Sequence, residues 1–236
     1  MKLPIFSLLL LTLFVCPFSL HAQKRAVSAI VIDERLSLLR LQPSLFANSS
    51  QRIRRGRRMQ IIGVAERDGV RFFKVAARPR FGWMQSEALV SRSRTEDEQR
   101  LVRLVNASVG FEQIELATIF FEMYPSSKFR SPVLLLYGDL LEEIAIKLSR
   151  DATSRLSRRE MLASGAPIYS YYLNFSSLDR YRKLGVTFLF NPETRTFHYD
   201  GASWNEIVRK LPSTPEAAEA RKRLESLKEK MERAAN

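Results

Sequence analysis

Five arginines crowd one short stretch of the sequence and are its clearest candidates for binding chemistry. They are Arg52, Arg54, Arg55, Arg57 and Arg58. The planar guanidinium group pairs through two hydrogen bonds with a carboxylate or a phosphate, so the cluster predicts an anionic partner. Because side chains alternate along a strand, we expect only the arginines of the preceding loop to converge on one ligand.

Catalytic and metal-binding chemistry has few candidates. The chain contains one cysteine, Cys16, and two histidines, His21 and His198. A thiolate–histidine peptidase and a zinc site both need more of these residues than the sequence carries after position 22. We expect His198 to be an exposed strand residue, and the adjacent Glu142 and Glu143 to point apart into solvent.

Fingerprints of hydrolases and nucleotide-binding proteins are missing as well. The sequence has no Gly-x-Ser-x-Gly, P-loop or dinucleotide-binding motif. We therefore expect a protein that is not an enzyme and that holds no cofactor and no metal. A wall-acting enzyme that uses two carboxylates distant in the sequence stays an alternative.

Residues 1–22 have the pattern of an export signal. A single charge at Lys2 precedes the apolar run Ile5–Phe18, and the small residue Ala22 stands before a polar stretch. We expect cleavage after Ala22 and a periplasmic or secreted protein. Two alternatives stay open: an uncleaved membrane anchor, for which the run is short, and lipid attachment at Cys16, where the preceding residue is bulky.

Positive charge is concentrated near the N-terminus. Residues 23–94 hold 16 Lys and Arg against 5 Asp and Glu, whereas residues 95–236 hold 21 against 20. Such a field attracts polyanions. Outside the cytoplasm the abundant anions are lipid headgroups and wall polymers rather than nucleic acid. A basic surface that only keeps the protein soluble explains the charge equally well.

Residues 24–94 carry the pattern of a small β-barrel. Asp68-Gly69 favours a hairpin between two of its strands. Aromatic side chains fall on both faces of the strand that follows, and we expect at least one of them in the core. The five predicted strands are Ala26–Ile32, Leu36–Leu41, Arg57–Glu66, Val70–Ala77 and Phe81–Gln85.

The order of landmarks in this segment resembles the bacterial SH3 domain family, with Ser37 as a departure where many members carry Asn. The resemblance implies an exported bacterial protein with a small barrel. In several members a shallow groove of the barrel engages peptidoglycan peptides or protein segments. The matching stretches are Leu38-Leu39-Arg40-Leu41-Gln42-Pro43-Ser44, Arg55-Gly56-Arg57-Arg58-Met59-Gln60-Ile61-Ile62-Gly63, Gly69-Val70-Arg71-Phe72-Phe73-Lys74-Val75, Gly82-Trp83-Met84 and Ala88-Leu89-Val90.

Trp83 is a further candidate for lining such a groove. A lone tryptophan after a glycine in a small barrel more often belongs to the core, and we favour that interpretation. Trp83 is nevertheless kept with the five arginines as a candidate ligand-binding residue.

A domain boundary is expected near residue 94, where the charge balance changes. Thr95 followed by three acidic residues predicts a helix start. Apolar residues then recur at helical spacing up to Gly110, which we expect to end the first helix. The pattern repeats up to Pro125 and again after Ser131-Pro132, a cap followed by a first-turn proline. Residues 95–236 are therefore predicted to be mainly helical.

Two stretches of this region echo each other. Each ends a helical pattern, turns at Pro-Ser and precedes another helix. The stretches are Phe121-Glu122-Met123-Tyr124-Pro125-Ser126-Ser127 and Val208-Arg209-Lys210-Leu211-Pro212-Ser213-Thr214. With Ala117 and Gly138 in their order, the region resembles the tetratricopeptide-like repeats of bacterial envelope assembly proteins, and the resemblance implies a surface that binds a partner protein. The two prolines are too far apart to belong to neighbouring repeats of roughly 34 residues, so an array of such repeats is interrupted.

The segment that interrupts the array is predicted to contain an inserted β-hairpin, Val186–Phe190 with Arg195–Tyr199. Aromatic residues crowd segment 169–181, and we favour packing against the hairpin over stacking on a sugar or peptide ligand. The apolar seam from Ala217 to Met231 is interpreted as a closing helix packed on its own domain, with a short coiled coil to a partner as the alternative.

Together these features predict a multidomain α+β protein. Its parts are a signal peptide (1–22), an SH3-like β-barrel (24–94) and a helical, repeat-like region (95–236) with a hairpin near 186–199. The expected function is that of an exported adapter of the bacterial cell envelope. Its basic barrel contacts an anionic wall, lipid or protein surface, its helices bind a partner protein, and nucleic acid is not a partner. A purely structural envelope protein is a further alternative.

Overall fold

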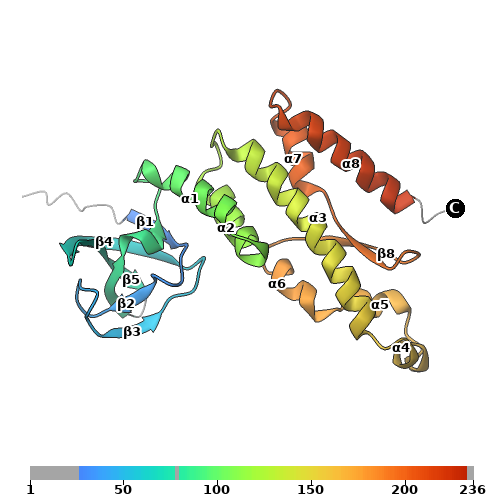
Figure 1. Ribbon diagram of the computed structural model, residues 1–236, viewed down its shortest axis with the longest axis horizontal. Helices are drawn as coiled ribbons and strands as arrows, with labels where there is room; N and C mark the ends of the chain where they lie inside the picture. Colours follow the sequence, from blue (N-terminus) through green and yellow to red (C-terminus); the bar gives the residue numbers. More distant parts are fainter. Residues whose placement is uncertain (1–26, 78–79, 233–236) are drawn as a thin grey trace, which may run out of the picture.

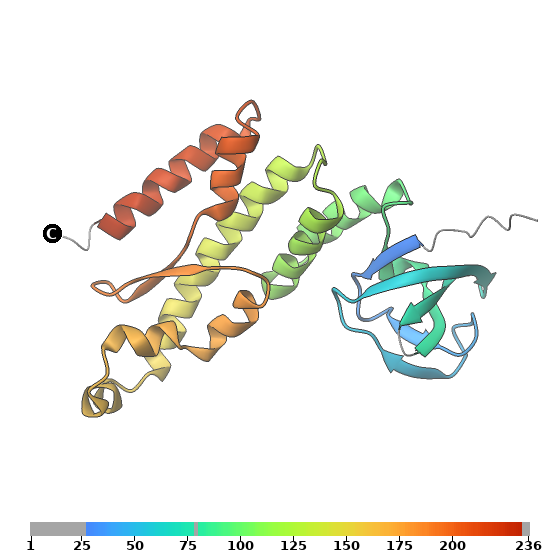
Figure 2. The ribbon, with the colours of Figure 1, turned by 180° about the vertical axis from the view of Figure 1, so that it is seen from behind.

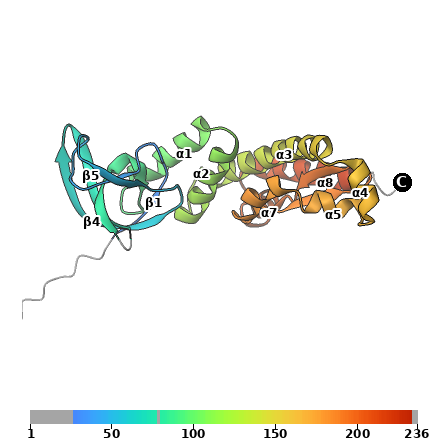
Figure 3. The same ribbon diagram turned by 90° about the horizontal axis from the view of Figure 1, so that it is seen from below.

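The structure, a computed structural model, describes residues 27–77 and 80–232. A curled β-sheet lies at one end of an elongated molecule, and the helices extend away from it (Figures 1 and 3). The predicted export signal and its alternatives fall on residues 1–26 and lie outside the described residues. Within the described ranges, none of the helices combines the length and the apolar character that a membrane span requires.

Seven antiparallel strands form the sheet, in the order β3-β2-β6-β5-β4-β1-β7. All five predicted strands are present. Two further strands, β3 and β7, were not predicted. A single 3-10 turn at Ser86–Ala88 directly precedes β7. The strands are β1 (Val27–Val31), β2 (Leu38–Arg40), β3 (Ser49–Arg52), β4 (Arg58–Arg67), β5 (Val70–Ala77), β6 (Arg80–Gln85) and β7 (Leu89–Val90).

The predicted β4–β5 hairpin is confirmed. Arg67 pairs with Val70 across the turn, and Asp68 and Gly69 both have positive φ, 55° and 70°. This backbone is the one that two-residue hairpin turns require, which explains the Asp-Gly pair. The Asp68 carboxylate also accepts hydrogen bonds from Ser44 Oγ (2.6 Å) and Leu45 N (2.9 Å). The turn therefore holds the loop between β2 and β3.

The sheet curls around an apolar core of its own. Val31, Leu39, Val75 and Met84 are fully buried there. The prediction that at least one aromatic residue of β5 is buried is confirmed, because Phe72 and Phe73 are 0% and 5% exposed.

Eight α-helices follow the sheet in the described residues. Gly110 begins the second helix, with φ 62°, and does not end the first as predicted. Ser131 is no cap either, because the third helix begins one residue earlier and the Ser131 hydroxyl bonds Thr214 Oγ1 at 2.8 Å. The helices are α1 (Glu96–Ala107), α2 (Gly110–Met123), α3 (Arg130–Arg155), α4 (Arg158–Ser164), α5 (Ile168–Leu173), α6 (Asp179–Arg182), α7 (Ala202–Lys210) and α8 (Glu216–Glu232).

Helix α3 is the axis of the helical region (Figure 2). The predicted hairpin forms from β8 (Phe188–Asn191) and β9 (Thr196–Tyr199), and Phe197 N donates to Ser149 Oγ of α3 at 2.7 Å. Helix α8 buries Ala217, Ala220 and Leu227 against α7 and α3. The interpretation of the last seam as a closing helix is therefore confirmed.

Three residues of the sheet region pack into a second apolar core, the one that the helices form. Ile30, Ile32 and Val90 of the sheet are 2%, 1% and 0% exposed, and they pack in the same cluster as Leu101 and Ile114 of the first two helices. Each such buried side chain contributes roughly 1.5–3 kcal/mol. The sheet and the α1–α2 pair consequently form one packed unit.

Candidate functional site

The arginine cluster of the sequence does not form one open patch. Arg55 lies at the junction between sheet and helices, and its side chain is only 9% exposed. Its Nη1 donates to Glu115 Oε2 of α2 at 2.8 Å and its Nε donates to the carbonyl of Ile32 at 2.9 Å. A further bond joins Nη2 to Glu112. Arg55 therefore fastens the two regions together.

Two more of the five arginines are engaged within the chain. Arg52 donates to the backbone carbonyls of Glu34 and, at 2.8 Å, Arg35. Arg58 forms an ion pair with Glu122 at the end of α2. These contacts connect loop and strand residues to their own molecule rather than to a partner.

Arg54 and Arg57 are exposed, and neither has an acidic or hydrogen-bonded side-chain partner in the described part of the chain. Arg57 N donates to the Arg54 carbonyl at 3.3 Å, and Gly56 between them has φ 78°. Only glycine adopts this backbone readily. The tight turn presents both guanidinium groups to solvent, so these two remain available to a ligand.

The acidic residues of α2 explain how the basic charge is distributed. Helix α2 carries Glu112, Glu115 and Glu122 and no lysine or arginine. All three glutamates pair with arginines of the sheet region. Part of the N-terminal excess of positive charge therefore neutralises the molecule's own second helix.

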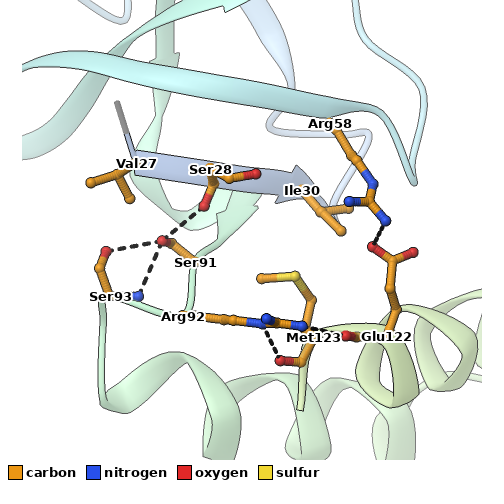
Figure 4. A pocket seen from close by; sticks show the side chains of 9 residues that line it. All are labelled: Val27, Ser28, Ile30, Arg58, Ser91, Arg92, Ser93, Glu122 and Met123. Carbon is orange, nitrogen blue, oxygen red and sulfur yellow. Dashed lines mark hydrogen bonds and ion pairs between the residues drawn. The ribbon is translucent and has the colours of Figure 1, made fainter. Parts of the chain in front are cut away.

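A cavity of about 450 Å³ lies where β1 meets α2, lined by the nine residues labelled in Figure 4. We call it the junction groove. Ile30 and Met123 give it an apolar floor, while the guanidinium groups of Arg58 and Arg92 enter it from opposite sides. Arg92 is positioned by α2, because its Nε and Nη2 donate to the carbonyls of Met123 and Glu122, both at 2.7 Å. These are the free carbonyls at a helix C-terminus.

Three serines line the wall of the groove beside β1 (Figure 4). Ser91 Oγ donates to the Ser28 carbonyl at 3.0 Å and contacts Ser93 Oγ at 2.9 Å. Hydroxyl groups both donate and accept hydrogen bonds. The groove thus combines two guanidinium groups, hydroxyls, an apolar floor and one carboxylate, that of Glu122, which pairs with Arg58. This lining suits a carboxylate-bearing ligand with short aliphatic parts that takes the place of Glu122 beside Arg58.

Two neighbouring hollows extend the junction groove. One, of about 630 Å³, shares Arg92 and Met123 with it and is bordered by Lys128. The other, of about 320 Å³, shares Ser28 and Arg58 with it and reaches the free Arg57. Because neighbouring hollows share lining residues, the three together connect Arg57 with Lys128.

Asp97 fixes the loop that carries Arg92. Its side chain is fully buried and accepts hydrogen bonds from Ser91 N (2.8 Å) and Arg100 Nη2 (2.9 Å), and it pairs with Arg94 at 3.1 Å. The predicted cap, Thr95, makes no capping hydrogen bond. Asp97 therefore holds the loop before α1 in place, whereas the capping bond predicted for Thr95 is not formed.

Tyr124 stands at the same loop. Its hydroxyl donates to the Ser91 carbonyl at 3.4 Å. Burial, together with the nearby carboxylates of Asp97 and Glu98, raises the pKa of Tyr124 to about 12. The hydroxyl consequently stays protonated and serves as a neutral donor at the edge of the groove.

Trp83 lies away from the groove and outside the core. It pairs with Lys74 and Arg40 on the face of β6 opposite the fully buried Met84. Its indole reaches over Lys74 toward Gly63, where an added Cβ would lie 4.0 Å from the ring. Phe81, two residues away on the same face, is 62% exposed. The preference for a core tryptophan was wrong, because Trp83 is a half-buried part of the outer face.

Glu142 and His198 were also misjudged from the sequence. His198 is 8% exposed, and its Nδ1 bonds Glu142 Oε1 at 2.9 Å. Glu142 additionally accepts from Lys230 Nζ (2.8 Å) and Tyr199 N (2.9 Å). Burial alone would raise the pKa of Glu142, but the bonds from His198, Lys230 and Tyr199 outweigh it and lower the pKa to about 2. Both residues were predicted to be exposed to solvent. Instead His198 is buried and Glu142 is partly buried, because the hairpin and α8 cover them.

The imidazole continues this chain of bonds to a hydroxyl, with His198 Nε2 and Thr196 Oγ1 3.0 Å apart. A carboxylate, an imidazole and a hydroxyl are thus connected, as in an acyl-transfer triad. The same carboxylate is neutralised by Lys230, and the cluster ties α3, the hairpin and α8 together. In the ranges that the structure describes, no three or more His, Cys, Asp or Glu side chains come close enough to hold a metal ion.

Comparison with models of protein families, with curated proteins and with solved structures found no significant match to this chain.

Proposed function

We propose that the protein is an exported, non-catalytic adapter of the bacterial cell envelope that binds a carboxylate-bearing segment in the junction groove. The observation that carries the proposal is that Arg58 and Arg92 both line the groove beside Ile30 and Met123, with the free Arg57 in the adjoining hollow. A ligand carboxylate would replace Glu122 as the partner of Arg58. Peptidoglycan stem peptides join free carboxylates to short aliphatic side chains, which is the chemistry that this lining suits.

An SH3-like identity of the sheet region fits this proposal. Short antiparallel strands wrap one apolar core, a 3-10 turn precedes the last strand, and the landmarks of the sequence stand in the order of the bacterial family. In this chain, however, three residues of the sheet region also pack into the core of the helices. The ligand-binding unit is therefore the sheet together with these two helices.

The helical region serves a partner protein in this account. Helices α1 and α2, and likewise α7 and α8, are neighbouring pairs with short connections, the arrangement that tetratricopeptide-like repeats use. Helix α3, with 26 residues, and the hairpin separate the two pairs. We assign partner binding to this region as a second contact of the adapter.

Sedimentation with purified peptidoglycan sacculi tests the ligand chemistry. The chain from Gln23 onward is expected to sediment with sacculi and to be released as salt screens the arginines. Sacculi whose carboxylates have been converted to amides are the matched control, and binding to them is expected to fall at least tenfold. Equal binding to both preparations would refute carboxylate recognition, and no binding to either would favour a purely structural role.

A carboxylate-using enzyme is the second candidate, and one cavity favours it. Asp200 and Glu206 line a hollow of about 220 Å³, and burial raises the pKa of Asp200, as expected for a proton donor. Both groups already have structural partners: Asp200 Oδ1 accepts from Ala202 N at 3.0 Å, and Glu206 accepts from Arg130 at 2.6 Å. Release of soluble fragments from sacculi, abolished by Asp200→Asn, would establish the enzyme in place of the adapter.

A further inference from the structure

Three large apolar side chains are exposed at the end of the molecule opposite the sheet. Leu162 of α4 is 60% exposed, and Tyr169 and Leu173 of α5 are 50% and 37% exposed. Both helices lie at this end in two opposite views (Figures 1 and 2). We call residues 155–173 the α4–α5 tip.

The packing of the two helices explains this exposure. Each helix buries one side chain in the molecule: Met161 of α4 is 5% exposed, and Tyr172 of α5 is 2% exposed and stacks on Phe190 with ring centroids 4.7 Å apart. Tyr169 and Leu173 are four residues apart and therefore lie on one side of α5, next to Tyr172, whose own side chain turns into the core. The exposed apolar face is thus a consequence of how α5 is docked.

Arginines surround these apolar side chains. Arg155, Arg158 and Arg159 are exposed, and within the described residues none of them pairs with a carboxylate. Arg158 and Leu162 are four residues apart on α4 and lie on one side of it. Glu160 is the single acidic residue of the tip. The tip therefore combines a cationic surface with protruding apolar groups.

We propose that the α4–α5 tip docks on the surface of an anionic phospholipid membrane. Leu162, Tyr169 and Leu173 enter the boundary between headgroups and acyl chains, and the arginines contact the lipid phosphates. Exposed apolar side chains flanked by basic residues are the combination that binds such interfaces. The inference goes beyond the proposed function, because it rests on the opposite end of the molecule from the junction groove.

The electrostatic attraction between the tip arginines and anionic lipid determines how far their removal weakens vesicle binding. A basic residue at an anionic membrane surface strengthens binding by roughly fivefold at physiological ionic strength. Removing three of them is therefore expected to weaken binding by about 100-fold. Binding to vesicles without anionic lipid should be weak, because only the apolar contacts remain.

Vesicle sedimentation with the chain from Gln23 onward tests the inference. The vesicles contain equal parts of phosphatidylglycerol and phosphatidylcholine, with pure phosphatidylcholine as the reference. We compare Arg155→Gln, Arg158→Gln and Arg159→Gln in one variant with Arg103→Gln, Arg209→Gln and Arg221→Gln in another. The control arginines are equally exposed and, among the described residues, have no acidic partner. The tip variant is expected to lose about 100-fold in binding and the control less than fivefold; equal losses would overturn the inference.

A depth measurement separates insertion from charge attraction. The variant Tyr169→Trp is expected to be quenched by brominated acyl chains in the anionic vesicles, whereas Val109→Trp, at an 81% exposed position in the α1–α2 turn, is not. Equal quenching of both would contradict insertion of the tip. Charge reversal of Arg54 and Arg57 distinguishes the two ends: if it abolishes vesicle binding while the tip variant keeps it, the membrane contact belongs to the sheet.

Discussion

Arg55 Nη1 and Glu115 Oε2 lie 2.8 Å apart, although 60 residues separate them in the sequence. The arginine comes from the loop before β4 and the glutamate from α2. Because the arginine side chain is 9% exposed, the pair is largely removed from water. It ties the loop before β4 to α2, and both of these segments adjoin the junction groove.

The variant Arg55→Met is expected to destabilise the protein by about 2–3 kcal/mol. It leaves Glu112, Glu115 and the Ile32 carbonyl without their donor, and a partly buried carboxylate that loses its partner is costly. Urea unfolding measures the change. The control is Arg54→Met, one position earlier and exposed, for which a loss below about 0.5 kcal/mol is expected. Similar losses at both positions would mean that the junction bonds contribute little.

Separation of the sheet from the helices is expected to destabilise the sheet. A chain shortened to residues 23–94 exposes Ile30, Ile32 and Val90, now at most 2% exposed, and loses on the order of 5 kcal/mol of apolar burial. We expect it to bind a hydrophobic dye and to unfold at a lower urea concentration than the whole chain. A monomeric fragment with the midpoint of the whole chain would show that the two regions are energetically independent.

Glu142 makes stability depend on acid pH. The pKa of its carboxyl is lowered from the ordinary value of 4.5 to about 2, so the folded state gains stability above pH 4.5 and loses it between about pH 4.5 and 2. Glu142→Gln is expected to cost about 2–3 kcal/mol at pH 7 and progressively less as the pH falls through this window. The control Glu143→Gln changes an exposed neighbour whose carboxylate pairs with Lys147. A cost for Glu142→Gln that does not vary with pH would contradict the ionised cluster.

Gly138 permits the closest approach of α3 and α7. A Cβ at this position would lie 2.3 Å from Trp204 Nε1 and 2.6 Å from Ser203 Oγ. Gly138→Ala is therefore expected to destabilise the protein by about 1–3 kcal/mol. In a Trp204→Phe background the clash with the indole nitrogen is absent, and the additional cost of Gly138→Ala should shrink. Additive costs in this double-mutant cycle would show that the indole is not the obstacle.

Much of the fold could be predicted from the sequence, because the signals were local. Alternating apolar residues marked β4 and β5, and Asp68-Gly69 marked their turn. Strand β3 was not predicted because Ser49–Arg52 has no alternation of apolar and polar residues. Its pairing with β2 holds it in the sheet. Gly110 was predicted to end α1 but begins α2. A glycine with positive φ occurs at the start of a helix as well as at its end, so the residue type alone did not distinguish the two.

The candidate site could be predicted only in part. The arginine cluster was visible, but which of its members are free depends on glutamates of α2 that lie far along the chain. No sequence pattern marked Arg92 as a groove residue. Its position depends on the hydrogen bond to the Met123 carbonyl, which is available because α2 ends there. His198 and Glu142 were misjudged for the same reason, because α8 and the hairpin bury them only after folding.

The most direct test of the central claim reverses the charge of the two free arginines beside the groove. The variant with Arg54→Glu and Arg57→Glu is expected to bind peptidoglycan sacculi at least tenfold more weakly than the unchanged chain and to unfold at the same urea concentration. The matched variant, with Arg103→Glu and Arg209→Glu, carries the same net charge and should bind within twofold of the unchanged chain. If both variants lose binding equally, or if neither does, the claim that the anionic ligand extends from the junction groove to the free arginines beside Arg58 is contradicted.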